Sequence, residues 1–416
     1  MRILYFSPRN FWPLNSGGHL RDYYLARETV RYASVSFLGI RNPDESDTDS
    51  ANMQGLKLGL EKLLLVDKGR SYTTWKILRG LIGPTPLTVL NYYDLKAARE
   101  LSRILDEQTF DLVQIEQVHL IGYLPIIRAC RSHPLVVCDW HNIESELMDR
   151  YGRYTRNWAR KLYVSRTTHL IKDVERRLLT ECDAHIVVSE RDQSTLRALV
   201  PEARVHIVEN GVDVARYANC EELAAPMLLG GSQQTRKDIV FVGSMDFHAN
   251  IDGASYFCTE VWPQIHALAP QFRFIVVGSR PAVEVRNLAQ SPGIIVTGEV
   301  DDVRPYYGSA FAAIVPLRVG GGTRLKILEA MAAGVPVVST SIGAEGLAVN
   351  PGVNILLADT PEEMARVLME LHHSHEMWQR LSAAGRELAR TRYDWCVIGS
   401  SLHRTHRLVF DQRPHG

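Results

Sequence analysis

The sequence predicts an α/β protein that is built from two doubly wound, parallel-sheet domains. The chain has 416 residues, which is enough for two or more domains of ordinary size with well-buried cores. Short apolar runs alternate with helical patterns along the chain, and this alternation is typical of parallel β-α-β units. Residues 217–237 are rich in Glu, Ala, Gly, Ser and Gln and show no apolar period, so we expect a loop there.

The expected strands are the short apolar runs, which fall into two series. The first series is Ile3–Ser7, Val35–Gly39, Lys62–Val66, Leu112–Ile115, Leu135–Cys138 and His185–Val188. The second series is Ile239–Val242, Phe274–Val277, Ile294–Val296, Ala312–Val315 and Val335–Ser339.

The boundary between the two domains is expected near residues 210–213, where Asn210-Gly211 suits a turn with positive φ. Helices expected over 361–373 and 375–390 close the second domain. A further helix is expected over 395–410, with apolar positions at Trp395, Ile398 and Leu402 among others.

Composition excludes several functional classes. Lys+Arg and Asp+Glu both total 47, so no global positive field would attract nucleic acid. The six cysteines form no Cys-x-x-Cys pair, which favours a reducing compartment and argues against a structural metal. The apolar run at the N-terminus is too short for a signal peptide. No run of about 18 apolar residues, the length that a membrane-spanning helix needs, is present. We therefore expect a cytoplasmic protein.

The most informative segment is residues 316–338, PLRVGGGTRLKILEAMAAGVPVV, which reads as strand end, glycine loop, helix, turn and buried strand. Glycines let backbone N–H groups approach a ligand, and the N-terminus of the following helix favours negative charge. Glu329 is the one carboxylate on the inner side of that helix, and burying it requires hydrogen-bond donors. An anion-binding loop with a polar anchor suits a sugar nucleotide, and an ordinary Gly-rich turn before an amphipathic helix is the alternative.

This segment resembles glycosyltransferase family 4, which has the GT-B fold of two Rossmann-like domains facing across a cleft. The resemblance implies that residues 1–210 form an acceptor-side domain and that residues 211–393 form the domain that binds the donor. It also implies that the final helix, within residues 394–416, crosses back to the first domain. It implies that Glu329 binds the ribose of the donor. The family's second glutamate, eight residues earlier, is Gly321 here, so backbone groups of Gly320, Gly321, Gly322 and Thr323 are expected to contribute to donor binding.

A second glycine pair, Gly17-Gly18, follows the first expected strand and opens a helix. The resemblance implies that this loop closes over the diphosphate and the acceptor. Arg21 lies one turn into the helix and is expected on the acceptor side, although a solvated Arg on a helix-starting loop remains an alternative.

His141 directly follows the strand that ends near Cys138. In the family this histidine lies beside the transferred sugar and the diphosphate, so the resemblance implies a catalytic role for His141. A hydrogen-bonded core histidine is the alternative. His119 follows the preceding strand and is the rival candidate, expected to line the acceptor side.

At the start of the second domain, Gly243-Ser244 follow the first strand. Many members of the family have an arginine just after this glycine and a lysine several residues on, where this chain has Ser244 and Asn250. Arg324 and Lys326 of the glycine-loop helix are therefore expected to offset the diphosphate charge. The resemblance also implies that backbone groups near Glu299 and Val300 contact the base, with a solvated loop as the alternative for Glu299.

Residues 150–177 hold nine Arg/Lys together with Tyr154, Trp158 and Leu162 at helical spacing. A basic, aromatic helix of this kind can lie on an anionic membrane, which would suit a lipid-linked acceptor. A core face with a solvated basic side is the alternative.

Together these features predict a glycosyltransferase that moves a sugar from a nucleoside-diphosphate donor to a hydroxyl of a carbohydrate or lipid-linked acceptor. The resemblance implies retention of anomeric configuration, no metal and no cofactor beyond the nucleotide sugar. A nucleotide-sugar epimerase of the same architecture and a catalytically silent binding subunit remain the alternatives. The sequence does not identify the base, the sugar or the acceptor.

Overall fold

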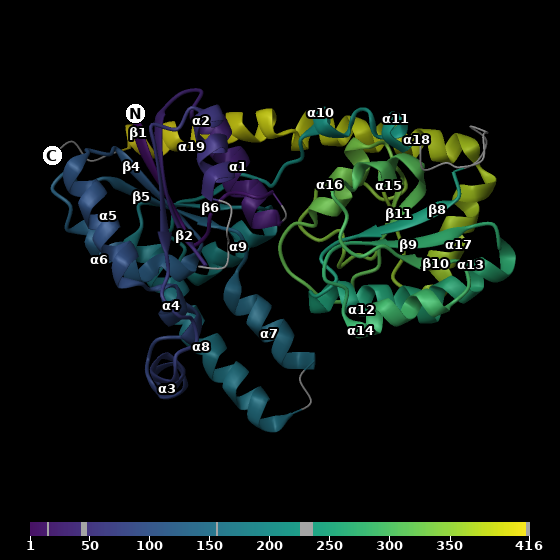
Figure 1. Ribbon diagram of the computed structural model, residues 1–416, viewed down its shortest axis with the longest axis horizontal. Coiled ribbons are helices and arrows are strands. Elements are labelled where there is room, and N and C mark those ends of the chain that lie inside the picture. Colours follow the sequence, from purple (N-terminus) through teal and green to yellow (C-terminus); the bar gives the residue numbers. More distant parts are fainter. Residues whose placement is uncertain (15, 43–47, 155–156, 225–235, 413–416) are drawn as a thin grey trace. The chain divides into compact units, whose positions relative to one another are not determined.

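The computed structural model describes residues 1–14, 16–42, 48–154, 157–224 and 236–412, and it divides into two compact units. Unit 1 consists of Met1–Asn210 with Trp395–Gly416, and unit 2 consists of Gly211–Asp394 (Figure 1). Of the loop expected over 217–237, Cys220–Ala224 form a short helix instead, and residues 225–235 lie outside the described residues.

The sheet of unit 1 has seven parallel strands in the order β3-β2-β1-β4-β5-β6-β7. Its strands are β1 (Arg2–Ser7), β2 (Ser34–Arg41), β3 (Lys62–Asp67), β4 (Leu112–Glu116), β5 (Leu135–Trp140), β6 (Ala184–Val187) and β7 (Val205–Ile207). Its helices are α1 (Gly17–Thr29), α2 (Thr48–Leu58), α3 (Thr74–Ile82), α4 (Leu87–Tyr92), α5 (Leu95–Glu107), η1 (Val118–Tyr123), α6 (Leu124–Arg128), α7 (Glu144–Tyr154), α8 (Trp158–Glu181), α9 (Glu190–Leu199) and α19 (Trp395–Asp411).

The two faces of this sheet bury different sets of side chains, because successive residues of a strand point to opposite sides. In β1, Leu4 and Phe6 belong to the core that α5, α6 and α8 cover, while Ile3 and Tyr5 belong to the core that α1 and α19 cover. Trp395 of α19 stacks on Tyr24 of α1 with ring centroids 5.0 Å apart. The last helix of the chain is therefore an integral layer of unit 1.

The sheet of unit 2 has six parallel strands in the order β10-β9-β8-β11-β12-β13. Its strands are β8 (Asp238–Val242), β9 (Arg273–Val277), β10 (Ile294–Val296), β11 (Ala310–Val315), β12 (Val337–Ser339) and β13 (Leu356–Leu357). Its helices are α10 (Val214–Tyr217), α11 (Cys220–Ala224), α12 (His248–Tyr256), η3 (Phe257–Val261), α13 (Trp262–Leu268), α14 (Val283–Asn287), η4 (Leu288–Gln290), α15 (Arg304–Ser309), α16 (Leu325–Ala332), α17 (Pro361–His373), α18 (His375–Leu388) and η5 (Ala389–Tyr393).

Each sheet is doubly wound and therefore has a point where the strand order reverses. In unit 1 the reversal lies between β1 and β4, and in unit 2 it lies between β8 and β11. In open α/β sheets, ligands bind beyond the carboxyl ends of the strands at this point. Among the described residues, no helix is long and apolar enough to cross a membrane.

Candidate functional site

The glycine loop of unit 2 follows β11 and therefore begins at the strand reversal. Gly320 has φ 141° and Gly322 has φ 69°, conformations that residues with a Cβ rarely adopt. The loop leads into α16, whose N-terminus has no side-chain cap. The backbone of Gly320, Gly321, Gly322 and Thr323 thus lies where the sequence predicts donor binding.

Arg324 does not extend away from the loop as a phosphate-binding side chain would. Its guanidinium donates to the carbonyl oxygens of Gly322 and Ile342, and the second of these bonds is 3.3 Å long. A Cβ on Gly320 would lie 3.0 Å from the same guanidinium. These bonds give Arg324 a role in shaping the loop, and its contact with phosphate stays a prediction.

Lys326 places its ammonium at the end of the neighbouring strand β8. Its Nζ donates to Asn250 Oδ1 at 2.8 Å and lies 4.3 Å from the centroid of the Phe241 ring. A Cβ on Gly243 would lie only 2.7 Å from Nζ. Asn250 in turn donates through Nδ2 to the carbonyl oxygen of Ser244, 2.8 Å away. A cation from α16 therefore lies next to the positions where the resemblance led us to expect cations after β8.

Burial lowers the pKa of Lys326 to about 7, and the nearby charge of Arg324 acts in the same direction. The carboxylate of Glu329 acts the opposite way. An anion arriving beside this amine would favour its charged form.

Glu329 lies in the interior of unit 2 rather than in bulk water. Its Oε2 accepts a hydrogen bond from the hydroxyl of Tyr307 at 3.3 Å, and the hydroxyl of Tyr217 also hydrogen-bonds the carboxylate. Burial raises its pKa, while these two hydroxyls lower it. A carboxylate has about four acceptor positions, so two remain for the hydroxyl groups of a ligand.

Two further groups at this edge of the sheet were missed or undervalued by the sequence analysis. Arg280, after β9, donates to Ser244 Oγ at 3.3 Å and pairs with Asp246 at 3.0 Å. It has φ 49°, a strained conformation that is enriched at functional sites. The hydroxyl of Thr323 is buried and has no hydrogen-bond partner among the described residues, so a ligand could supply one.

The predicted base contacts, Glu299 and Val300, follow β10 at the edge of the sheet. Glu299 is exposed, and Val300 packs partly buried against the core of unit 2. The structure offers no further feature that distinguishes base binding from a solvated loop, so this role stays a prediction.

In unit 1, the loop before α1 combines glycines with a cation. Ser16 caps the helix by accepting a hydrogen bond from the backbone N–H of His19, and Gly17-Gly18 form its first turn. A Cβ on Gly18 would lie 1.4 Å from Nη1 of Arg9, so the absence of a side chain at Gly18 leaves room for this guanidinium. Arg9 follows β1 by two residues and was not singled out from the sequence.

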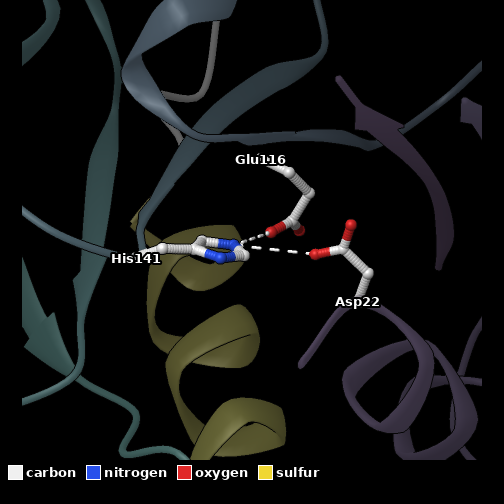
Figure 2. A group of neighbouring side chains, drawn as sticks. All are labelled: Asp22, Glu116 and His141. Atoms are coloured by element: carbon white, nitrogen blue, oxygen red, sulfur yellow. Dashed lines mark hydrogen bonds and ion pairs between the residues drawn. The ribbon is translucent and has the colours of Figure 1, made fainter. Parts of the chain in front are cut away.

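His141 lies in a buried cluster with two carboxyl groups at the strand reversal of unit 1 (Figure 2). Its Nε2 is 3.0 Å from Oε2 of Glu116, the last residue of β4, and 3.6 Å from Oδ1 of Asp22 in α1. The hydroxyl of Ser7 donates to the other oxygen of Asp22 at 2.7 Å, and Gln114 donates to Glu116 at 2.8 Å. These contacts fix the orientation of the imidazole.

Burial dominates the protonation of this cluster. It lowers the pKa of His141 to about 4 and raises that of Asp22 to about 6. It also raises the pKa of Glu116 well above its usual range, with the charge of Asp139 adding to the effect. At neutral pH the imidazole is therefore neutral, and burial favours the protonated form of Glu116.

The same three side chains are the group among the described residues whose ligand atoms could hold a metal ion, because these atoms lie within 4.8 Å of one another. Two observations disfavour a cation there. The charge of Arg9 acts on Asp22 and Glu116, and burial raises the pKa of both carboxyl groups, which disfavours the ionised form that a metal ligand needs. Metal independence stays a prediction.

Arg21, which the sequence placed on the acceptor side, is buried in unit 1. It pairs with both oxygens of Asp139 at 2.8 Å and also donates to the carbonyl oxygens of Val208 and Glu209 and to Oδ1 of Asn210. Since its guanidinium is occupied by these groups, the acceptor-contact prediction is replaced by a role in joining α1 to β5 and to the end of β7.

His119 lies near this cluster, in η1 after β4. Its ring stacks on Tyr92 with centroids 4.9 Å apart, and its Nε2 is 4.0 Å from Glu144. Burial lowers its pKa to about 4 and raises that of Glu144 to about 7. The acceptor-side role of His119 stays a prediction.

The basic segment 150–177 spans the end of α7 and most of α8. Residues 155–156 and the side chains of Arg153 and Tyr154 lie outside the described residues. Of the predicted aromatic and apolar positions, Trp158 and Leu162 are exposed. They are therefore not part of a core face, which was the alternative to membrane contact.

Comparison with solved structures identifies the fold. Sucrose-phosphate synthase from Thermosynechococcus elongatus superposes with a TM-score of 0.73 at 16% identity and covers 99% of each chain. Anabaena HepE, in complex with UDP and glucose, superposes with a TM-score of 0.65 at 13% identity, covering 97% of this chain and 99% of its own. The architecture is the GT-B fold of glycosyltransferases.

Sequence comparisons identify the family. Residues 67–216 match the model of Glycosyltransferase Family 4, and residues 236–374 match that of Glycosyl transferases group 1. The chain belongs to glycosyltransferase family 4.

Curated relatives are matched over only part of their length. A phosphatidyl-myo-inositol mannosyltransferase of Mycobacterium leprae is 26% identical over 208 residues, which are 48% of this chain and 54% of that protein. An uncharacterised 44.6 kDa protein in the cps region of Klebsiella pneumoniae is 22% identical over 40% of this chain and 45% of its own. The chain thus spans about half the length of the curated relatives it matches.

Proposed function

We propose that this chain transfers a sugar from a nucleoside-diphosphate donor to a hydroxyl acceptor, with unit 2 binding the donor. The observation that carries the proposal is the ammonium of Lys326 beside the end of β8, next to a glycine loop and on the same helix as the half-buried carboxylate of Glu329. The cation and the backbone N–H groups can bind the diphosphate of a donor. The carboxylate can accept hydrogen bonds from the hydroxyl groups of its ribose. All of these groups lie at the strand reversal, where α/β sheets bind ligands.

The chemical role of these groups follows from the charge that develops during transfer. As the glycosidic bond breaks, negative charge grows on the leaving diphosphate, and preorganised donors stabilise it. Lys326, the N-terminus of α16 and the backbone of residues 320–323 supply such donors. We assign Gly243 and Ser244 to the same phosphate-binding edge.

In unit 1 we propose that Gly17-Gly18 with Arg9 form a second anion-binding element and that His141 acts beside the transferred sugar. Burial keeps the imidazole neutral, so it can accept a hydrogen bond from a sugar hydroxyl or donate one to it. Retention of configuration and metal independence are part of this proposal and rest on the family resemblance.

The acceptor is proposed to be a carbohydrate or a lipid-linked carbohydrate, in polysaccharide or glycolipid assembly. Two comparisons support this class: the Mycobacterium leprae relative is a phosphatidyl-myo-inositol mannosyltransferase, and another relative comes from a Klebsiella pneumoniae cps region. No nucleic-acid partner is expected, because the chain has no excess of positive charge.

A nucleotide-sugar epimerase is the second candidate, and one observation favours it. The buried pair Asp22 and Glu116 beside His141 supplies acid and base groups of the kind that epimerisation requires. The carboxyl cluster lies in unit 1, whereas the donor-binding groups lie in unit 2.

The experiment is a two-stage assay on the whole chain. Thermal shifts with UDP, GDP, ADP and CMP identify the base, because a ligand at 100 times its Kd adds about 2.7 kcal/mol to stability. The matching nucleotide sugars are then incubated without acceptor. Slow release of free sugar supports a transferase, an isomerised sugar nucleotide identifies an epimerase, and binding without either product identifies a silent binding subunit.

A further inference from the structure

Helix α3 of unit 1 exposes nearly all of its apolar residues. Trp75 is 66% exposed and Ile82 is 75% exposed, and Ile77, Leu78 and Leu81 are exposed as well. In a helix of nine residues, a sequence this apolar would ordinarily be buried against the core.

The exposure follows from how α3 is attached. At 3.6 residues per turn, its five apolar side chains share a face about 160° wide, while Lys76 and Arg79 point to the other side. The one buried residue is Gly80, where an added Cβ would lie 2.7 Å from Leu87. The helix is therefore anchored through its small residue, with the apolar face directed outward.

The first turns of α8 continue this exposed surface. Trp158 is 78% exposed and Leu162 is 67% exposed, and they lie one helical turn apart. One turn further on, Arg166 of α8 donates to the carbonyl oxygens of Gly80 and Gly83, at the C-terminal end of α3. In Figure 1, α3 and the beginning of α8 lie at the lower edge of unit 1, beyond the strands. We define the docking surface as Trp75, Leu78, Leu81, Ile82, Trp158 and Leu162.

The two sequence stretches that carry the docking surface contain positive charges and no negative ones. Residues 68–93 contain four Lys/Arg and no Asp or Glu, and residues 157–172 also contain four Lys/Arg and no Asp or Glu. The whole chain is neutral, with 47 of each sign. Positive charge is thus concentrated where the large apolar side chains are exposed.

We propose that the docking surface binds the surface of an anionic lipid bilayer, with its two tryptophans and aliphatic side chains in the interfacial layer. Exposed apolar patches of this kind mark interaction sites, and tryptophan with flanking cations suits the headgroup region. Each Lys or Arg near an anionic leaflet adds attraction. A second copy of this chain is disfavoured as the occupant, because a two-fold interface would bring the same positive segments together.

This proposal extends the proposed function, since a lipid-linked acceptor would be reached at such a surface. Its test is independent of that function, because vesicle binding requires neither donor nor acceptor. The full chain is mixed with vesicles of phosphatidylcholine alone, or with about 30 mol % phosphatidylglycerol, and bound protein is measured by co-sedimentation. We expect binding to the anionic vesicles that weakens as NaCl rises from about 0.1 to about 1 M.

The variants locate the contact. Trp75→Glu with Ile82→Glu, and separately Trp158→Glu, should each weaken binding to anionic vesicles roughly tenfold or more. The matched control is Leu268→Glu in unit 2, which replaces a leucine that is 70% exposed and should bind as the parent chain does. Since all four residues are exposed, melting temperatures should be unchanged.

A second readout uses quenching of tryptophan fluorescence by brominated lipid, which should fall when Trp75 and Trp158 are both replaced by Phe. The proposal is overturned if the parent chain does not sediment with anionic vesicles, or if the Leu268→Glu control loses as much binding as the docking-surface variants. It is also overturned if sedimentation velocity shows that the parent chain is a dimer which these variants dissociate, because the surface then binds a second copy.

Discussion

Lys326 is the single residue on which donor binding depends most in this account. Its ammonium is the cation at the end of β8, since Arg324 is bound to carbonyl oxygens of Gly322 in its own loop and of Ile342 after β12. Because its pKa is about 7, Lys326 gains or loses its proton, and hence its charge, around neutral pH.

The pH dependence of donor binding should report this lysine. A diphosphate raises the pKa of Lys326, so binding takes up a proton. The affinity for the diphosphate should therefore be highest below pH 7, where Lys326 is already charged in the free protein. It should fall by up to about tenfold per pH unit as the pH rises from 7 towards the raised pKa that Lys326 has in the complex. Titration calorimetry from pH 6 to 9 measures it.

Controls separate the lysine from the ligand's own phosphate groups. Lys326→Arg keeps its charge throughout, so its affinity should lack the decline above pH 7. Lys326→Met should bind weakly at every pH, and Lys237→Met, an exposed lysine of unit 2, should behave as the parent chain. A pH profile that is the same for the parent chain and Lys326→Arg would contradict the assignment.

Several site residues could be predicted from the sequence because they lie inside a recognisable segment. Gly320, Gly322, Lys326 and Glu329 are close together in the chain, and the local spacing already indicates a loop, a helix and an inward carboxylate. The structure places Lys326 and Glu329 as that spacing suggests, although it turns Arg324 inward.

Glu116, Arg9 and Arg280 were missed because their significance arises only when strands are side by side. Glu116 and Asp22 are far apart in sequence and meet His141 only across the β1–β4 reversal. The sequence did contain a signal for Glu116, Arg9 and Arg280, because each of them ends or follows an apolar strand. Polar residues at strand ends could have been collected systematically by that rule.

At the scale of elements, Arg21 connects three parts of unit 1. It joins α1 to Asp139 of β5 and to the chain after β7, and both members of the ion pair are almost completely buried. Removing one member of a buried pair leaves the other charge without compensation.

Arg21→Ala should therefore destabilise unit 1 by about 3–5 kcal/mol, measured as the shift of its urea unfolding transition. Arg103→Ala removes an arginine from an exposed ion pair on α5 and should leave the transition where it is. The combined variant Arg21→Met with Asp139→Leu should recover much of the loss, because no charge is then left unpaired. If Arg21→Ala unfolds at the same urea concentration as Arg103→Ala, the structural role is refuted.

The expected strands were confirmed with small shifts in their ends, and two strands were not anticipated. β7 has three residues and β13 has two, and both lie at sheet edges. An edge strand is paired on one side, so it needs no long apolar run. The interior strands, buried on both faces, carry the continuous apolar runs that made them visible in the sequence.

At the scale of the whole molecule, the two units repeat one arrangement. Each is a doubly wound parallel sheet whose strand order reverses beside its first strand, and each carries a glycine-containing helix start at that reversal. In unit 2 the helix start is accompanied by Lys326 and Glu329, and in unit 1 by Arg9 and the cluster around His141. The division follows the predicted ranges except at Asp394, while the donor and acceptor roles remain proposals.

The central claim is that unit 2 binds a nucleoside diphosphate at the β8–β11 reversal. A crystal structure of the chain with the diphosphate that stabilises it most tests this claim directly. We expect phosphate oxygens about 3 Å from Lys326 Nζ and from backbone N–H groups of residues 320–323. The ribose hydroxyls should donate hydrogen bonds to the carboxylate of Glu329. A nucleotide bound elsewhere, or at this edge with Lys326 still bonded to Asn250 and Glu329 bonded only to its tyrosines, would contradict it.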